Sequence, residues 1–280
     1  MRRSPERIRQ LRFDHLISFV FWLVPLSITA LFVWILSDLV RGGLKTLSWS
    51  FLTTAPMDAG RAGGIAPVIV STLLILLVCL VVALPIGAGT AILLAEFTPR
   101  DHWFGGLVRC SLDILAGVPS IVFGLFGNAF FAKTLGLGFS LLSGGLTLAC
   151  MVLPILIRST EAGLRAVPQE YRLNSEALGI SQSSTLWQVT LPSAMPGLVA
   201  GLVLGLGRAI AETAALIFTS GYVDRMPSSL LDSGRSLSIH IFDLSMNVTG
   251  GDSNAYGSAL VLIFILLIIN AIAGLARNKS

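Results

Sequence analysis

The stretch VPQEYRLNSEALGISQSSTLWQVTLPS, residues 167–193, decides how the rest of the chain is interpreted. It is polar and charged, yet it lies between two apolar runs. Pro168 suits the first turn of a short helix and Gly179 suits its end. Ser183 or Ser184 can cap a second short helix that stops before Pro192. Neither helix is long or apolar enough to cross a bilayer, so we expect a helical hairpin at the membrane surface.

The composition around this stretch is that of an integral membrane protein. The chain has 280 residues, of which 54% are hydrophobic and 12% charged, whereas soluble domains carry about 25% charged residues. Its 28 glycines suit membrane helices, which use small residues to pack closely. We therefore expect an all-α polytopic membrane protein with six transmembrane helices, at Leu16–Leu36, Pro67–Ala95, Leu107–Ala132, Phe139–Ile157, Ala194–Gly221 and Gly257–Ala276.

Two further expectations concern the shape of these segments. Gly117, Pro119, Gly124 and Gly127 interrupt the third span and favour a kink with close packing. Ser236–Met246 has the pattern of an amphipathic surface helix between the last two spans.

The distribution of Lys and Arg predicts the orientation. With the N-terminus in the cytoplasm, twelve basic residues lie inside and six outside, Arg208 being within a span. This bias favours cytoplasmic N- and C-termini and places the 167–193 stretch in the cytoplasm. Residues 1–64 then form a cytoplasmic tail, the first span and a periplasmic loop, and residues 65–280 form a core with the remaining five spans.

The fifth span carries two charges on a face of small residues. At about 100° per residue, seven side chains fall in one stripe about 80° wide, namely Gly197, Gly201, Gly205, Arg208, Glu212, Ala215 and Thr219. Each charge costs about 2.5–3.5 kcal/mol at the centre of a membrane helix. Arg208 and Glu212 either neutralise each other or line a substrate pathway, and we favour the pathway. The three glycines are expected to pack against another helix.

The third span carries a second possible pair. Arg109 and Asp113 lie four residues apart and therefore on one face. They form either a local ion pair or, alternatively, separate bonds in which Asp113 reaches a neighbouring helix or loop.

The signatures of enzymes are missing from the sequence. It holds no GxxxxGK[ST], HExxH or GxSxG pattern, so we expect no ATP hydrolysis by this chain and no cofactor. His15, His102 and His240 lie far apart, which speaks against a metal site. The basic loops are explained by membrane orientation, so no nucleic-acid partner is expected. An intramembrane enzyme remains a minor alternative.

The helical stretch resembles the EAA loop of ABC importer permeases. In that family, Glu-Ala-Ala is followed by three residues, Gly, nine residues, an aliphatic, any residue and Leu-Pro. Gly179, Val189, Leu191 and Pro192 match this spacing. The Glu-Ala-Ala positions depart from it because they hold Leu173, Asn174 and Ser175. The nearest acid, Glu176, lies one helical turn after the usual Glu position, roughly on the same face.

The segments GLGRAIAETAALIFTSG and GVPSIVFGLFG, together with HIF and AYGSALVLI, resemble the membrane subunits of bacterial phosphate importers, and the last two favour the PstA type. This resemblance implies the type I ABC importer permease fold and an inner-membrane location. It also implies a PstC-type permease partner, two copies of a PstB-type ATPase that bind ATP and Mg, and a periplasmic phosphate-binding protein. The alternative is a permease for molybdate, sulfate or another small solute.

The resemblance assigns roles to individual residues. Arg208, Glu212 and Thr219 are expected on the substrate pathway. In the EAA-like loop, taken as residues 158–193, the residues expected to couple to the ATPase are Tyr171, Arg172, Glu176, Ala177, Gly179, Trp187, Leu191 and Pro192. Tyr171, Leu178 and Trp187 supply the apolar contacts, with Arg165, Arg172 and Glu176 at the rim.

Overall fold

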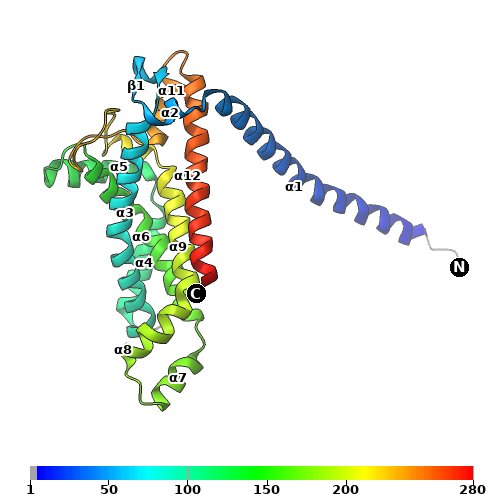
Figure 1. The fold of residues 1–280 in the computed structure, drawn as a ribbon. Coiled ribbons are helices and arrows are strands. Elements are labelled where there is room, and N and C mark those ends of the chain that lie inside the picture. The colour runs from blue at the N-terminus through cyan, green and yellow to red at the C-terminus, as the bar shows by residue number, and fades with distance from the viewer. Residues whose placement is uncertain (1–4, 100, 280) are drawn as a thin grey trace.

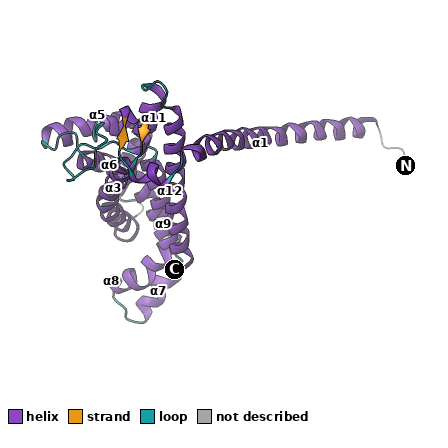
Figure 2. Cartoon of the chain, turned by 45° about the horizontal axis from the view of Figure 1, so that its top comes forward, coloured by secondary structure: helices purple, strands orange, loops and turns teal. Residues whose placement is uncertain are grey.

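The computed structural model describes residues 5–99 and 101–279, and the surroundings of side chains from 17 to 99 and from 101 to 275. The chain forms an elongated helical bundle from which α1 (Pro5–Thr46) projects sideways (Figure 1, Figure 2). The β-hairpin of β1 (Pro56–Met57) and β2 (Ala62–Gly63), joined by the 3-10 turn η1 (Asp58–Gly60), marks one end, which we call the hairpin end. The helices α7 (Gln169–Ala177) and α8 (Gln182–Thr185) lie at the opposite end, the loop end (Figure 1).

Five helical segments are long and apolar enough to cross a membrane, and a bent helix pair brings the number to six when it is counted as one span. The five segments are Ile17–Thr46, Ala66–Phe97, Leu141–Ala166, Gln182–Ile210 and Asp252–Leu275. The first segment is part of α1, and the second is α3 (Ala66–Ile92) followed by the π-helical turn η2 (Leu93–Phe97). The third is α6 (Leu141–Ala166) and the last is part of α12 (Asp252–Lys279). The fourth is α8, which continues through the π-helical turn η4 (Leu186–Thr190) into α9 (Leu191–Ile210). The expected all-α, six-span architecture is confirmed.

Helix α6 is the centre of the bundle. Its most apolar window is 67% buried, whereas that of α1 is 0% buried. Small residues let its neighbours approach closely: a methyl group added at Gly145 would lie 2.5 Å from Val78 of α3, and one at Gly205 would lie 2.5 Å from Val152. Burial of α6 between α3 and α9 therefore depends on glycine at the contacts.

The third span is not one kinked helix, which corrects the sequence prediction. It consists of α4 (Trp103–Gly117) and α5 (Ser120–Gly127), and α5 runs on into the π-helical turn η3 (Asn128–Thr134). The two halves meet at 102°. Val118 is extended, because the residue before a proline is pushed out of the helical region. Pro119 precedes the first residue of α5 and is itself non-helical, with ψ of 140°.

The fifth span is also broken, and here no break was expected. Helix α9 ends at Ile210, and the four-residue helix α10 (Ala214–Ile217) follows after a gap. The carboxylate of Glu212 accepts a hydrogen bond from the backbone N of Ala215 at 3.1 Å. This side chain caps the new helix and thereby competes with continuation of α9.

The two broken spans meet each other. Gly124 of α5 lies against the backbone of Ala215, and the amide of Asn128 donates to the carbonyl of Phe218 at 2.7 Å. The expected close packing at Gly124 is therefore directed at the second half of the fifth span.

Several predicted ends were too short, because helices continue past the end of the apolar run. Helix α1 reaches Thr46 rather than Leu36, and α6 reaches Ala166 rather than Ile157. The residues after Leu36, which were expected to form a loop, hold the end of α1, then α2 (Trp49–Thr53) and the hairpin. The second helix of the 167–193 stretch does not stop before Pro192. It runs through η4 into α9, and Pro192 is the second residue of α9.

The expected surface helix forms but is half buried. Helix α11 (Leu237–Met246) buries Leu237, Ile239, His240 and Leu244 at the hairpin end. Burial lowers the pKa of His240 to about 4, with the nearby Arg235 acting in the same direction.

Candidate functional site

The loop end is built from two short helices joined by a tight turn. Helix α7 starts after Pro168 and ends in the hydrogen-bond pattern of a Schellman motif. The N–H of Ile180 donates to the carbonyl of Ser175 at 3.0 Å, and the N–H of Gly179 donates to that of Glu176 at 2.9 Å. Gly179 has φ of +72°, a conformation that side chains disfavour. The hydroxyl of Ser181, rather than Ser183 or Ser184, caps α8.

This end exposes large apolar side chains. The exposed fractions are 47% for Tyr171, 77% for Leu178 and 64% for Trp187. Leu173 and Ile180 add to the same exposed set. Such a group of apolar side chains on a polar loop is typical of a surface that binds a protein. Glu176, Ala177 and Pro192 are also exposed, while Leu191 is partly buried.

Arg172 turns inward instead of lying at the rim, which corrects the sequence prediction. Its guanidinium donates to both carboxylate oxygens of Glu96 in η2, at 3.1 and 2.5 Å. It also donates to the carbonyls of Leu164 and Val167 at the end of α6, each at 3.1 Å. Arg172 therefore ties α7 to two neighbouring segments. The hydrogen bonds to Glu96 raise the pKa of Arg172 further, so it stays charged.

Glu161 of α6 is a second centre of charge that the sequence prediction missed. Glu161 is 4% exposed. Its carboxylate accepts hydrogen bonds from Arg109 and Arg165, both at 3.0 Å. Arg165 also donates to the carbonyl of Leu94 at 2.6 Å, so it too points inward rather than to the rim. The signal that could have found Glu161 is an acid placed four residues before Arg165 on the continuation of the fourth span.

Arg109 and Asp113 do not pair with each other. Arg109 bonds Glu161, and Asp113 accepts from Arg158 of α6 at 2.5 Å. The local ion pair is therefore wrong, and the alternative, in which Asp113 bonds a neighbouring helix, is confirmed.

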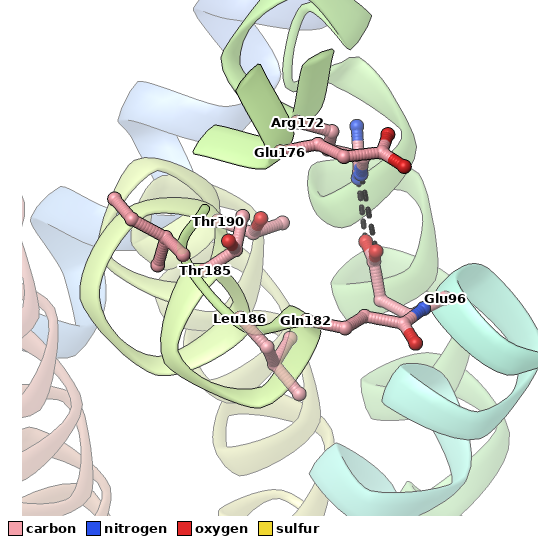
Figure 3. A pocket seen from close by; sticks show the side chains of 8 residues that line it. Glu96, Arg172, Glu176, Gln182, Thr185, Leu186 and Thr190 are labelled. Carbon is pink, nitrogen blue, oxygen red and sulfur yellow. Dashed lines mark hydrogen bonds and ion pairs between the residues drawn. The ribbon is translucent and has the colours of Figure 1, made fainter. Parts of the chain in front are cut away.

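A polar cavity of about 490 Å³ lies between α7, α8, η4 and the end of α3. Figure 3 shows the side chains around it, with the Arg172–Glu96 pair on one side and Thr185, Leu186 and Thr190 on the other. The hydroxyl of Thr190 is buried and has no hydrogen-bond partner among the described residues.

The three residues predicted for the substrate pathway are not brought together in one stripe, because α9 ends before Glu212. Arg208 is exposed in the last turn of α9 and makes no hydrogen bond or ion pair with any residue that the structure describes. Glu212 is 8% exposed and caps α10. Thr219 is fully buried, and its hydroxyl donates to the carbonyl of Ala215 at 2.8 Å. The alternative in which Arg208 and Glu212 neutralise each other is not seen, because no ion pair joins them within the described part of the chain.

The glycines of α9 face α6. A methyl group at Gly197 would lie 2.5 Å from the Cα of Gly163, and one at Gly201 would lie 2.9 Å from Ser159. Within residues 5–99 and 101–279, no three side chains of the metal-ligating types come together.

Comparisons with known proteins agree with this architecture. Residues 83–278 match the family model "Binding-protein-dependent transport system inner membrane component". The chain is 30% identical over 275 residues to the probable ABC transporter permease protein YqgI of Bacillus subtilis, covering 93% of each protein. It is 34% identical to the phosphate transport system permease protein PstA of Mycobacterium leprae, over 90% of this chain and 83% of that protein.

Solved structures show the same fold at low identity. The inward-facing MetNI methionine ABC transporter matches with a TM-score of 0.60 at 17% identity, covering 76% of this chain and 96% of that one. A bacterial ABC transporter involved in alginate import matches with a TM-score of 0.58 at 14% identity, covering 95% and 96%.

The fold is thus that of type I ABC importer permeases, and the relatives are transport subunits rather than enzymes. A permease of this kind works with a separate ATPase and a solute-binding protein. The chain belongs to the family of inner-membrane components of binding-protein-dependent transport systems.

Proposed function

We propose that this chain is the PstA-type permease subunit of a phosphate importer and forms part of the path for inorganic phosphate. Relatives named phosphate transport system permease protein PstA, at 33–34% identity in two mycobacterial species, support phosphate as the transported solute. The observation that carries the proposal is the exposed guanidinium of Arg208 on a membrane helix.

An exposed Arg208 cannot face lipid, because a charge at membrane depth is stable only beside water, another polar group or a partner subunit. A guanidinium offers a fork of donors that fits phosphate oxygens and stays charged when water is removed. Arg208 therefore suits a transient anion site at the interface with a second permease.

Glu212, four residues after Arg208 and just beyond the end of α9, is proposed to contribute a hydrogen-bond acceptor to that site. One of its oxygens caps α10, and the other makes no hydrogen bond with any residue that the structure describes. We assign this second oxygen to the protonated oxygen of phosphate, which sulfate lacks. Thr219, being buried, supports α10 through its backbone bond rather than lining the path.

The loop end is the proposed contact with the ATPase. The exposed Tyr171, Leu178 and Trp187 fill a cleft of the ATPase, and Gly179 fixes the angle between the two short helices. Because α8 continues through η4 into α9, a movement of the loop reaches the span whose last turn holds Arg208. The remaining coupling residues of the loop are Glu176, Ala177, Leu191 and Pro192. Glu176 takes the place of the glutamate in the family's Glu-Ala-Ala pattern.

The proposed assembly pairs this chain with a PstC-type permease, two PstB-type ATPase subunits and a periplasmic phosphate-binding protein. ATP and Mg are bound by the ATPase subunits, and this chain binds no cofactor. Both termini and the loop end lie in the cytoplasm, as the bias of basic residues favours. The division at residue 65 separates the first span from the five-span core.

The test measures uptake of labelled phosphate in a strain that lacks its own PstA-type subunit and carries Arg208→Gln. We expect uptake to fall by about two orders of magnitude, because removing one partner of a hydrogen-bonded charge pair, here Arg208 and the bound anion, costs about 2–5 kcal/mol. Arg208→Lys should restore uptake only partly, because an ammonium keeps the charge and loses the fork. Glu212→Gln should reduce uptake less than Arg208→Gln does.

The matched control is Arg225→Gln, which removes an exposed arginine from the loop at the hairpin end. It should leave uptake unchanged. Native uptake by Arg208→Gln, in complexes that contain equal amounts of ATPase, would show that Arg208 is not on the path.

A further inference from the structure

The end of α3 is held by arginines from three different helices. The five-residue turn η2, which continues α3, is π-helical. The buried carbonyl of Leu94 accepts from Arg165 of α6 at 2.6 Å and from Arg109 of α4 at 3.5 Å. Glu96, two residues later, accepts from Arg172 of α7.

Glu161 fixes two of these arginines. One of its oxygens accepts hydrogen bonds from the Nε of Arg109 and the Nε of Arg165, both at 3.0 Å. The Nη2 atoms of both arginines are then directed at Leu94. The side chain of Glu161 is 6% exposed, so this arrangement is screened little by water.

The Arg172–Glu96 pair is the part of this cluster that includes the loop end. The side chain of Glu96 is 10% exposed, and its two oxygens receive two separate donors of one guanidinium. Such bidentate pairs fix geometry as well as charge. Apart from this pair and the two carbonyls at the end of α6, helix α7 packs mainly on α8 and η4.

Helix α7 follows α6 directly in the chain, and Arg172 bonds the last carbonyls of α6. Besides that link, α7 has two connections to the bundle, and each of these passes through a π-helical turn. One is covalent and runs through η4 into α9. The other is the ion pair to η2 and so to α3. The cavity of about 490 Å³ lies between the two turns and is lined by Glu96 on one side and Thr190 on the other (Figure 3).

We propose that Arg172 and Glu96 are positioning residues that carry movement of α7 into α3, so that the ATPase moves α3 together with α9. The proposal rests on the proposed function and adds a second route to it. Glu161, Arg165 and Arg109 hold η2 in the form that receives Arg172.

The test is a charge exchange in the complete transporter. Arg172→Glu and Glu96→Arg are made singly and together, and three quantities are measured: ATPase bound to the permease, the rate of ATP hydrolysis, and phosphate taken up per ATP. Each single variant should keep its ATPase and lower uptake per ATP by about tenfold, within the range of coupling energies known for such networks. The double variant should recover most of the native ratio.

Asp101→Arg is the matched control, because Asp101 is exposed in the turn after η2 and makes no bond with the described residues. It should behave as the native chain. A native ratio of uptake to hydrolysis in the single variants, or a double variant no better than the singles, would overturn the proposal. Failure of the native complex to bind an ATPase would instead overturn the proposed function.

A second measurement keeps Arg172 and Glu96 in place, so it remains valid if the charge-exchange variants do not fold. Spin labels are attached to cysteines placed at Leu173 of α7 and Phe97 of η2, both exposed, in a chain without its native cysteines. In the complete transporter, the distance between these labels should stay constant when ATP is bound. A distance that changes between the nucleotide-free and ATP-bound states would show that α7 and η2 move separately and would overturn the proposal.

Discussion

The contact between α6 and α9 and the loop between α7 and α8 both depend on glycine, but for different physical reasons. At the helix contact, Gly197 leaves space for the backbone of Gly163. In the loop, Gly179 has open space around it and is needed for its φ of +72°. A glycine in the interior thus determines whether the bundle packs, and a glycine in the loop determines the direction in which the chain leaves a helix.

The largest effect is expected from Gly197→Val. The added side chain meets the Cα of Gly163 and the carbonyl of Ser159, and backbone atoms cannot turn aside as a side chain would. Overpacking of this kind costs about 1–3 kcal/mol and occasionally more. We expect a marked loss of thermal stability in detergent and little protein in the membrane.

Gly207→Val is the control within the same helix, because a methyl group there meets nothing within 4 Å in this chain. It should keep the native melting temperature in the isolated permease. Equal loss of stability for both variants would mean that β-branching in α9, rather than the contact with α6, is responsible.

A smaller effect on stability is expected from Gly179→Val. A side chain in the left-handed region costs about 1–2 kcal/mol, and nothing nearby clashes with it. The bundle should therefore fold, while transport per ATP falls or the ATPase dissociates. Copurification of the ATPase and uptake of phosphate measure these two results.

Asparagine sharpens the difference between the two sites, because it tolerates the left-handed conformation and still occupies volume. Gly179→Asn should retain most of the uptake, whereas Gly197→Asn should be as unstable as Gly197→Val. If both asparagine variants behave alike, the two glycines do not serve separate purposes.

The sequence was sufficient to place the spans because bilayer crossing depends on the local property of hydropathy. It was not sufficient to give their ends or breaks. The polar end of α6, up to Ala166, is helical because Arg165 and Glu161 bond within it and to η2. The break after Ile210 has no proline or glycine to mark it and depends on the capping carboxylate of Glu212.

The candidate site was predicted in the same uneven way. Gly179 and the exposed apolar residues of the loop follow from local turn chemistry and amphipathic pattern. The partners of Arg172 and Arg109 do not, since Glu96 and Glu161 lie 76 and 52 residues away in the sequence. Spacing along one helix indicates only which charges are neighbours on that helix. In the folded chain, tertiary packing places acids from other helices nearer to Arg109 and Arg172 than those neighbours are.

The most direct test of the account is reconstitution in liposomes of this chain with a PstC-type permease, a PstB-type ATPase and the phosphate-binding protein. The account predicts ATP-dependent accumulation of labelled phosphate that requires this chain and that excess sulfate or molybdate does not inhibit. Accumulation of a different anion, or phosphate transport of equal rate without this chain, would contradict it.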